Sequence, residues 1–370
     1  MIKRNILLNP GPATTTDSVK MAQVVPDICH REKEFVNIVD SIISDLTKIA
    51  GGDENYTTVL IGGSGTSAQD AVINSVVDKD HKLLVVNNGA YGERMCKIAQ
   101  AYSIPYVEIT CDWDKPPVLD QIESALKNDR SIKFVAAVHH ETTTGLLNPA
   151  KEIGTIAKKY HCVFILDTIS SFAGIPFNIK EYNIDFMMAS SNKCIQGMPG
   201  CAFVICKKEE LEKTATNPPR SFYLNLFNEY NTFLKTHEMR FTPPIQVIYS
   251  LRKAIDEFFA EGGVEARYRR YSRSWETLVK GVEMLGFKRL LKDEWESHIL
   301  TTFIEPDHPN YDFKKLHDLL FEREFTIYPG KIGKMKTLRL ANLGAIDFRD
   351  IENFLKELKD VMFQMNLSLK

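Results

Sequence analysis

The sequence predicts an α/β protein with a large, mostly parallel sheet of seven strands, followed by a smaller α+β domain. Seven short runs of apolar, often β-branched residues recur before residue 206, and stretches of helical periodicity separate most of them. Runs that are apolar throughout are typical of parallel strands, which helices cover on both faces. After about residue 255 the pattern changes to a long charged helix and short strands, which predicts the second domain.

The expected elements of the large sheet follow one another in chain order. Strands are expected at 58–61, 83–86, 106–109, 134–138, 163–166, 186–189 and 202–205. Helices are expected between them at 67–77, 93–102, 118–127 and 151–160. The stretch 190–200 is too short for the crossover that a parallel neighbour needs, so it indicates an antiparallel, hairpin-like return.

The C-terminal part begins after a break at Glu261-Gly262-Gly263. A charged helix is expected to run from there to about residue 285, followed by strands near 298–305, 325–328 and 337–340 and a final helix from residue 347. Residues 16–255 are therefore expected to form the large domain and residues 256–370 the small domain.

Composition excludes several classes of partner. The 370 residues carry 46 Lys and Arg against 48 Asp and Glu, which gives no broad positive surface for nucleic acid or an anionic membrane. The longest apolar stretches, such as 201–206, are far shorter than the roughly 20 residues that span a bilayer. Seven cysteines without a Cys-x-x-Cys pair favour reduced thiols, so a cytoplasmic protein is expected.

Two further patterns are expected to be structural. His139 and His140 are adjacent on an extended segment and point to opposite faces, so they are not expected to bind a metal. The basic and aromatic run 267–273 resembles a nucleic-acid-binding pattern, but in a mildly acidic protein it is expected to be an exposed helix face.

A glycine-rich loop directly follows the first expected strand. The sequence Gly62-Gly63-Ser64-Gly65-Thr66 precedes a helix, and backbone N–H groups and hydroxyls at a helix N-terminus suit a phosphate. A dinucleotide site would need an acidic residue after the next strand, where Asn87-Asn88 stand instead. The loop alone is also compatible with an ordinary turn.

Two charged residues stand where ligands of such sheets usually bind, just beyond the carboxyl ends of strands. Asp167 follows the strand 163–166, and Lys193 follows the strand 186–189. Each residue alone has a common structural explanation. Together with the glycine loop they match the needs of a phosphorylated aldehyde cofactor: a phosphate cradle, a lysine for a Schiff base and an acid at the pyridine nitrogen.

Several segments resemble the class V pyridoxal-phosphate aminotransferases, which have the fold of type I enzymes. They are Leu7-Leu8-Asn9-Pro10-Gly11-Pro12, Gly63-Ser64-Gly65-Thr66, Asn88-Gly89-Ala90-Tyr91-Gly92, Glu141-Thr142-Thr143-Thr144-Gly145, Asp167-Thr168-Ile169-Ser170-Ser171, Ser191-Asn192-Lys193-Cys194 and Arg339-Leu340-Ala341-Asn342-Leu343-Gly344. The segment around Lys193 is the most specific. The resemblance implies a PLP-dependent aminotransferase of fold type I, with residues 1–15 lining the active site.

The resemblance also implies roles for the residues that contact pyridoxal phosphate. Lys193 would form the Schiff base, and Asp167 would pair with the pyridinium nitrogen. Tyr91 would stack on the ring, and Thr142 would hydrogen-bond near the ring hydroxyl. The phosphate would be held by Ser64, Gly65, Thr66 and Asn192.

Two arginines and a threonine are implied for the substrate and the partner subunit. Arg339 matches the arginine that binds the acidic group of the substrate. Arg31 is a candidate for a second anion contact, although the mixed charges around it also fit a solvated helix start. Thr242 would reach the phosphate of the neighbouring subunit, which implies a homodimer with shared active sites.

The resemblance is greatest to the branch that acts on a small aminophosphonate and an oxo acid, through 139–145, 192–197 and 240–242. A serine– or alanine–glyoxylate aminotransferase of the same class is the alternative within the fold. A noncatalytic protein that binds a phosphate ligand is the alternative from another class. A cysteine desulfurase is excluded, because no cysteine follows Cys206 to act as its nucleophile.

Overall fold

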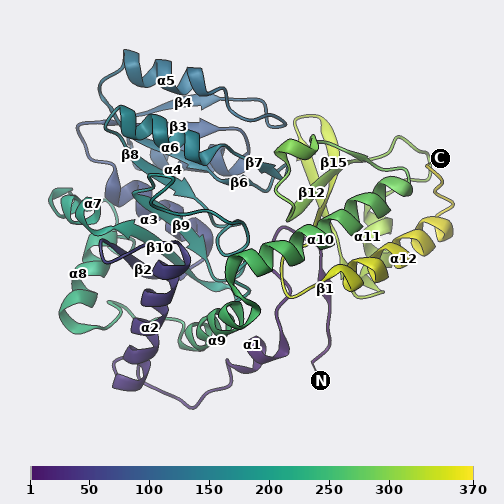
Figure 1. Ribbon diagram of the computed structural model, residues 1–370, viewed down its shortest axis with the longest axis horizontal. Helices are drawn as coiled ribbons and strands as arrows, with labels where there is room; N and C mark the ends of the chain where they lie inside the picture. The colour runs from purple at the N-terminus through teal and green to yellow at the C-terminus, as the bar shows by residue number, and fades with distance from the viewer. Residues whose placement is uncertain (1, 370) are drawn as a thin grey trace.

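The large sheet is confirmed in the computed structural model, which describes residues 2–369 (Figure 1). Its order is β2-β10-β9-β8-β5-β3-β4, and β10 is antiparallel to both neighbours while the other pairs are parallel. The antiparallel return expected after 186–189 is therefore confirmed. The strands are β2 (Tyr56–Gly63), β3 (Lys82–Asn87), β4 (Tyr106–Thr110), β5 (Ile132–Val138), β8 (Val163–Asp167), β9 (Phe186–Ser190) and β10 (Gly200–Lys207).

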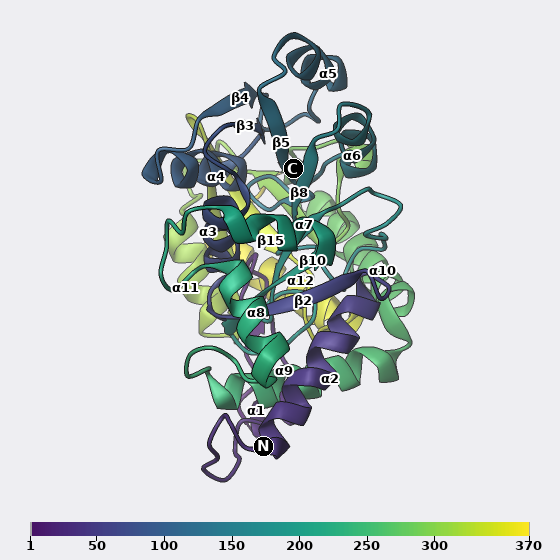
Figure 2. The same cartoon turned by 90° about the vertical axis from the view of Figure 1, so that its left-hand side faces the viewer.

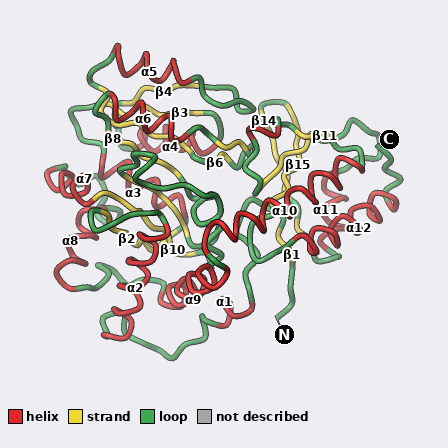
Figure 3. Tube along the Cα trace, in the orientation of Figure 1, coloured by secondary structure: helices red, strands yellow, loops and turns green. Residues whose placement is uncertain are grey.

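Helices cover both faces of this sheet, as its apolar strands require (Figure 3). Successive side chains of β3 show the alternation: Leu84 and Val86 join one core, Leu83 and Val85 the other. The first core contains residues of α2 (Lys33–Ile49), α5 (Leu119–Asn128), α6 (Ala150–Lys159) and α9 (Ile245–Glu261). The second contains residues of α3 (Gly65–Val76), α4 (Ala90–Ala101), α7 (Lys208–Lys213) and α8 (Leu226–Thr236).

A second, antiparallel sheet of order β11-β12-β15-β14 has its own core (Figure 1). Its strands are β11 (Lys288–Arg289), β12 (Leu300–Ile304), β14 (Tyr328–Ile332) and β15 (Met335–Ala341), and the helices beside it are α10 (Gly263–Met284), α11 (Phe313–Phe321) and α12 (Phe348–Gln364). Figure 2 shows α2 and α8 in front and the helices of the small sheet behind them. The single strand expected at 325–328 is wrong, because β13 (Phe325–Thr326) and β14 belong to different sheets.

The N-terminal segment is attached to both parts of the molecule. β1 (Ile6–Leu7) pairs in parallel with β13, and Ala13 donates its N–H to the Asn192 carbonyl at 2.9 Å. The short helix α1 (Asp17–Met21) follows, and a small hairpin of β6 (His140–Glu141) and β7 (Leu146–Leu147) lies after β5. The first residues of the chain are thereby fixed beside the turn that carries Lys193.

The division into residues 1–15, 16–255 and 256–370 stays a prediction. The position 255/256 falls inside α9, whose Phe258 still packs in the core of the large sheet. The helix ends at Gly262, which has a positive φ of 103°, so the chain turns there rather than at 255. Among residues 2–369, no helix has the length and apolarity needed to cross a membrane.

Gly154 gives a test of the packing of α6 against the large sheet. A Cβ at this position would overlap the backbone carbonyl of Tyr182 and lie 2.9 Å from the Phe164 ring. Alanine normally stabilises a helix by about 1 kcal/mol relative to glycine. We expect Gly154→Ala to lower the free energy of unfolding by about 1–3 kcal/mol instead, measured by urea denaturation. The exposed neighbour variant Thr155→Ala should change it by less than about 0.5 kcal/mol, and a stabilised Gly154→Ala protein would contradict this packing.

Candidate active site

Lys193 lies in the turn between β9 and β10, at the carboxyl edge of the large sheet. Its Nζ donates a hydrogen bond to the carbonyl of Pro10 at 2.5 Å, and a Cβ at Gly11 would overlap the same amine. The pKa of Lys193 is lowered to about 8, mainly by burial and to a smaller extent by the positive charges of Arg339 and Arg94, while Cys194 and Asp167 oppose the shift. The amine is therefore neutral at a lower pH than an ordinary lysine, as a nucleophile requires.

Asp167 ends the neighbouring strand β8 and is 3% exposed. One of its oxygens accepts from the Gln69 side chain at 2.5 Å, and the other accepts from the backbone N–H of Ile169 at 2.8 Å. Burial raises the pKa of Asp167 to about 6, while these hydrogen bonds and the charges of Arg94 and Lys193 lower it. The carboxylate keeps lone pairs for one further donor, such as a protonated ring nitrogen.

The glycine loop lies at the N-terminus of α3, where the phosphate cradle is expected. Ser64 is its N-cap residue but makes no side-chain hydrogen bond to the helix, and the first turn holds no acidic side chain. Gly65 packs against Ile169, where a Cβ would come within 2.8 Å of a side-chain carbon. Thr66 accepts a hydrogen bond from Arg94 at 3.1 Å. The positive end of a twelve-residue helix, with a free hydroxyl beside it, suits a phosphate.

Asn192 stands immediately before Lys193, and its Oδ1 accepts from the Ser190 hydroxyl at 2.9 Å. Its backbone carbonyl accepts the Ala13 N–H. The structure thus places Asn192 in the same turn as the lysine and beside the N-terminal segment.

Tyr91 and Thr142 come from different elements in the region around Lys193 and Asp167, which is named the cleft. Tyr91 lies in the first turn of α4, and the Arg94 guanidinium is 4.7 Å from the centre of its ring. Thr142 is buried in the turn between β6 and β7. The turn is linked to the start of α4, since Ala90 donates its N–H to the Thr143 hydroxyl at 3.1 Å.

Arg339 extends from β15 of the small sheet to the turn of Thr142. Its Nη1 donates to the Thr142 carbonyl at 3.1 Å, and its Nε and Nη2 donate to the Pro329 carbonyl at 3.2 and 2.8 Å. The Tyr328 ring lies beside it, 4.7 Å from the guanidinium carbon. A guanidinium has five N–H groups, so one remains on each terminal nitrogen for an anion.

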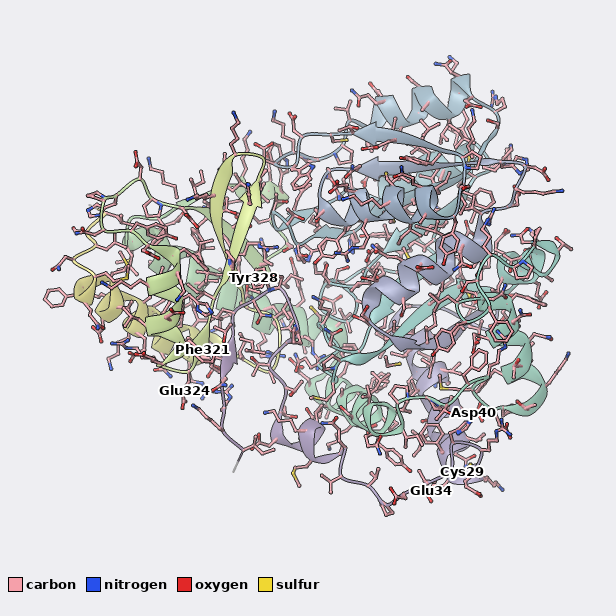
Figure 4. The ribbon with its side chains drawn as sticks, turned by 180° about the vertical axis from the view of Figure 1, so that it is seen from behind. Cys29, Glu34, Asp40, Phe321, Glu324 and Tyr328 are labelled. Carbon is pink, nitrogen blue, oxygen red and sulfur yellow. The ribbon has the colours of Figure 1, made fainter. Side chains whose placement is uncertain are left out.

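The structure does not bring Thr242 or Arg31 to this cleft within one chain. Thr242 is exposed beside Phe241 and Tyr223. The Arg31 side chain is 62% exposed and forms an ion pair with Glu238 at 3.4 Å. Figure 4 labels Cys29 and Glu34, which flank Arg31 in the chain, far from Tyr328. Both roles, like those of the other expected site residues, stay predictions.

Sequence reasoning missed several groups in or near the cleft. Gln69 lies one turn after the glycine loop and Arg94 one turn after Tyr91, so helical spacing could have found them. Glu141 is buried beside Thr142, and neither ring nitrogen of the buried His140 has a hydrogen-bond partner among residues 2–369. Both residues lie in segments that carry the family resemblance, but the sequence assigned neither of them a role in the site.

The exposed helix face expected at 267–273 is wrong for Arg267, which is 1% exposed. Its guanidinium donates to the Cys194 carbonyl at 2.7 Å and to Glu261 at 2.8 Å. Tyr271 accepts from the Gln196 side chain at 2.7 Å. This part of α10 packs against the lysine turn, which is why its polar groups are buried.

The donor set fits pyridoxal phosphate. Lys193 offers a weakly basic amine to the aldehyde, Asp167 a buried carboxylate to the ring nitrogen, and α3 an uncapped N-terminus to the phosphate. The described part of the chain holds no group of three His, Cys, Asp or Glu side chains placed to bind a metal ion.

Comparisons of sequence identify similar proteins. The family model described as aminotransferase class-V matches residues 17–341. The chain is 42% identical to a 2-aminoethylphosphonate–pyruvate transaminase of Vibrio vulnificus over 97% of this chain and 98% of the relative. It is 41% identical to a protein of that name in Phocaeicola vulgatus, over 96% and 98% of the two chains.

Solved structures with the same fold were also found. The ureidoglycine–glyoxylate aminotransferase of Bacillus subtilis superposes with a TM-score of 0.91 at 22% identity, covering 100% of this chain and 96% of that one. The alanine–glyoxylate aminotransferase of Nostoc sp. gives 0.90 at 25% identity, covering 98% and 96%.

The lowered pKa of Lys193 predicts how attachment of pyridoxal phosphate depends on pH. Only the neutral amine attacks, so the rate of attachment to the apoprotein should rise about tenfold per pH unit below about 8 and level off above it. Arg339→Gln removes a positive charge that lowers this pKa, so the midpoint should move to higher pH. Stopped-flow absorbance measures both.

The exposed Lys336 of the same strand supplies the control, because Lys336→Ala should leave the midpoint unchanged. A wild-type midpoint near the ordinary lysine value of 10.5 would contradict the effect of burial.

Proposed function

Because the chain belongs to the aminotransferase class-V family, we propose that it transfers an amino group between 2-aminoethylphosphonate and pyruvate, with pyridoxal phosphate as cofactor. The products are phosphonoacetaldehyde and L-alanine. The observation that carries the proposal is Arg339, which reaches from the small sheet to the cofactor side of the cleft and keeps two N–H groups for an anion. Relatives about 40% identical over nearly the whole chain carry this activity in their names.

Arg339 can serve both substrates. A planar guanidinium binds a phosphonate or a carboxylate through two parallel hydrogen bonds, so the donor and pyruvate can occupy the same place in turn. Pro329 and Thr142 fix the guanidinium before the substrate arrives, which reduces the entropy lost on binding. A shared place for the two substrates predicts ping-pong kinetics.

Pyridoxal phosphate would supply an aldehyde able to carry the amino group from donor to acceptor. Asp167 would keep the ring nitrogen protonated, since its buried carboxylate has little competition from water. Lys193, once its amine is free, takes the proton from the substrate carbon that carries nitrogen. The Pro10–Gly11 segment lies against this amine and helps to exclude water from it.

We propose that the enzyme is a homodimer in which Thr242 of each copy completes the phosphate cradle of the other. An exposed aromatic cluster supports this arrangement: Phe222 is 78% exposed and its ring lies 5.8 Å from that of Phe241, next to Thr242. Apolar surface of this kind is typical of an interface. All seven cysteines lie within the described residues and are free thiols, which supports a cytoplasmic location.

A panel of amines tests the donor. The holoenzyme is mixed in single turnovers with 2-aminoethylphosphonate, alanine, serine, phosphoserine or glutamate, and the absorbance of the bound cofactor is followed. We expect fast changes with 2-aminoethylphosphonate and alanine only. Fast changes with serine instead would favour the glyoxylate type of aminotransferase, and a protein with no cofactor band after reconstitution would favour the noncatalytic alternative.

Arg339→Lys tests the anion contact. The lysine keeps one positive charge but loses the two parallel N–H groups, so KM for 2-aminoethylphosphonate should rise about tenfold or more. The affinity for pyridoxal phosphate should change much less, because Arg339 is not part of the phosphate cradle. Steady-state kinetics measure the first and cofactor titration the second, with the exposed Lys334→Ala as the control in the same hairpin. An unchanged KM would remove Arg339 from the substrate site.

A further inference from the structure

Glu141 is a buried carboxylate for which the proposed mechanism has no role. It lies in β6 and is 0% exposed. Among residues 2–369 it forms no ion pair, and burial raises its pKa to about 7. A buried carboxylate without a paired cation is costly unless it is well hydrogen-bonded. Its contacts therefore indicate what it does.

The Glu141 carboxylate connects the hairpin turn to helix α4. One oxygen accepts from the backbone N–H of Tyr91 at 3.2 Å. The other accepts from the backbone N–H of Thr143 at 3.2 Å and from its hydroxyl at 2.5 Å. The Thr143 hydroxyl in turn accepts the N–H of Ala90 at 3.1 Å. The turn thus accepts hydrogen bonds from the N–H groups of Ala90 and Tyr91 at the start of α4, which a helix by itself leaves unsatisfied.

Gly89 makes this contact possible. It is the N-cap residue of α4, and a Cβ there would overlap both the Cγ and the Cδ of Glu141. The glycine before Tyr91 is thus required by the close approach of a carboxyl group, not by its backbone conformation, since its φ of 171° is open to any residue.

The same turn carries the other contacts of the cleft. Thr142 lies between Glu141 and Thr143, and its carbonyl accepts from Arg339 at 3.1 Å. The negative charge of Glu141 also raises the pKa of Arg339, against the larger effect of burial. One carboxylate therefore orients Tyr91, the Thr142 turn and, through that turn, the substrate arginine.

We propose that Glu141 is a positioning residue for the cofactor, which holds Tyr91 and Thr142 in a fixed relation so that both reach the same ring. Glu141 does not touch the cofactor itself. It acts through the backbone of Tyr91 and through the turn that carries Thr142. The inference rests on the proposed function, because it needs pyridoxal phosphate in the cleft.

Glu141→Gln tests the inference with the shape of the side chain retained. The substitution replaces one acceptor oxygen of the carboxylate with an NH2 group, which can only donate. At least one of the N–H or O–H groups that now donate to Glu141 therefore loses its acceptor. We expect the Kd for pyridoxal phosphate to rise about tenfold or more, measured by titration of the apoprotein. We also expect the absorbance maximum of the bound cofactor to shift, since the Tyr91 ring moves relative to it.

Two further variants separate positioning from a general loss of stability. Gly89→Ala pushes on the Glu141 carboxyl group without changing its chemistry and should reproduce both effects. Asp185→Asn is the matched control: it also removes a largely buried carboxylate with a raised pKa, which accepts the backbone N–H of Phe164 at 2.8 Å, but at the opposite edge of the sheet. This variant should lose stability and keep the wild-type Kd and spectrum.

The outcomes distinguish the inference from the function on which it rests. If the wild-type chain does not bind pyridoxal phosphate, the proposed function fails. If the wild type binds it and Glu141→Gln has the same Kd and spectrum, the positioning role is overturned. An equal loss of affinity in Asp185→Asn overturns it as well. If Glu141→Gln does not fold, the Kd and the absorbance spectrum of Gly89→Ala test the positioning role in its place.

Discussion

The active site depends on the turn between β9 and β10. Ser191 closes this turn, because its backbone N–H and its hydroxyl both donate to the Cys201 carbonyl at 2.9 Å, while Gly197 donates back to the Ser191 carbonyl at 2.7 Å. The antiparallel return keeps Lys193 at the carboxyl edge of the sheet, beside the strand that ends in Asp167. The N-terminus of α3, Tyr91 and Arg339 are all arranged around this pair.

The cleft collects three cations, Lys193, Arg94 and Arg339, and two buried carboxylates, Asp167 and Glu141. The excess of positive charge suits a phosphate and an acidic substrate together. Burial moves the pKa of Lys193 down to about 8 and that of Asp167 up to about 6. Desolvation thus favours a neutral amine at Lys193, while Asp167, with a pKa of about 6, is still mostly ionised at neutral pH.

The sequence was sufficient to predict the seven strands and the positions of Lys193 and Asp167 at the carboxyl edge, because a buried strand and the residue after it are set by a local apolar pattern. Glu141 was not predictable, since its role arises only when its hairpin meets helix α4, about 50 residues away in the chain. The burial of Arg267 was not predictable for the same reason. Its helix has an amphipathic pattern, but in the fold the guanidinium donates a hydrogen bond to the Cys194 carbonyl in the turn of Lys193.

The attachment of the N-terminal segment has a consequence for biosynthesis. β1 pairs with β13, a strand that leaves the ribosome more than 300 residues later, and the Pro10 carbonyl that faces Lys193 lies in the segment that directly follows β1. Residues 6–7 can therefore pair only after residues 325–326 have been synthesised. A nascent chain can complete its large sheet once β10 is made, yet the segment that lies against Lys193 is anchored to β13 only later.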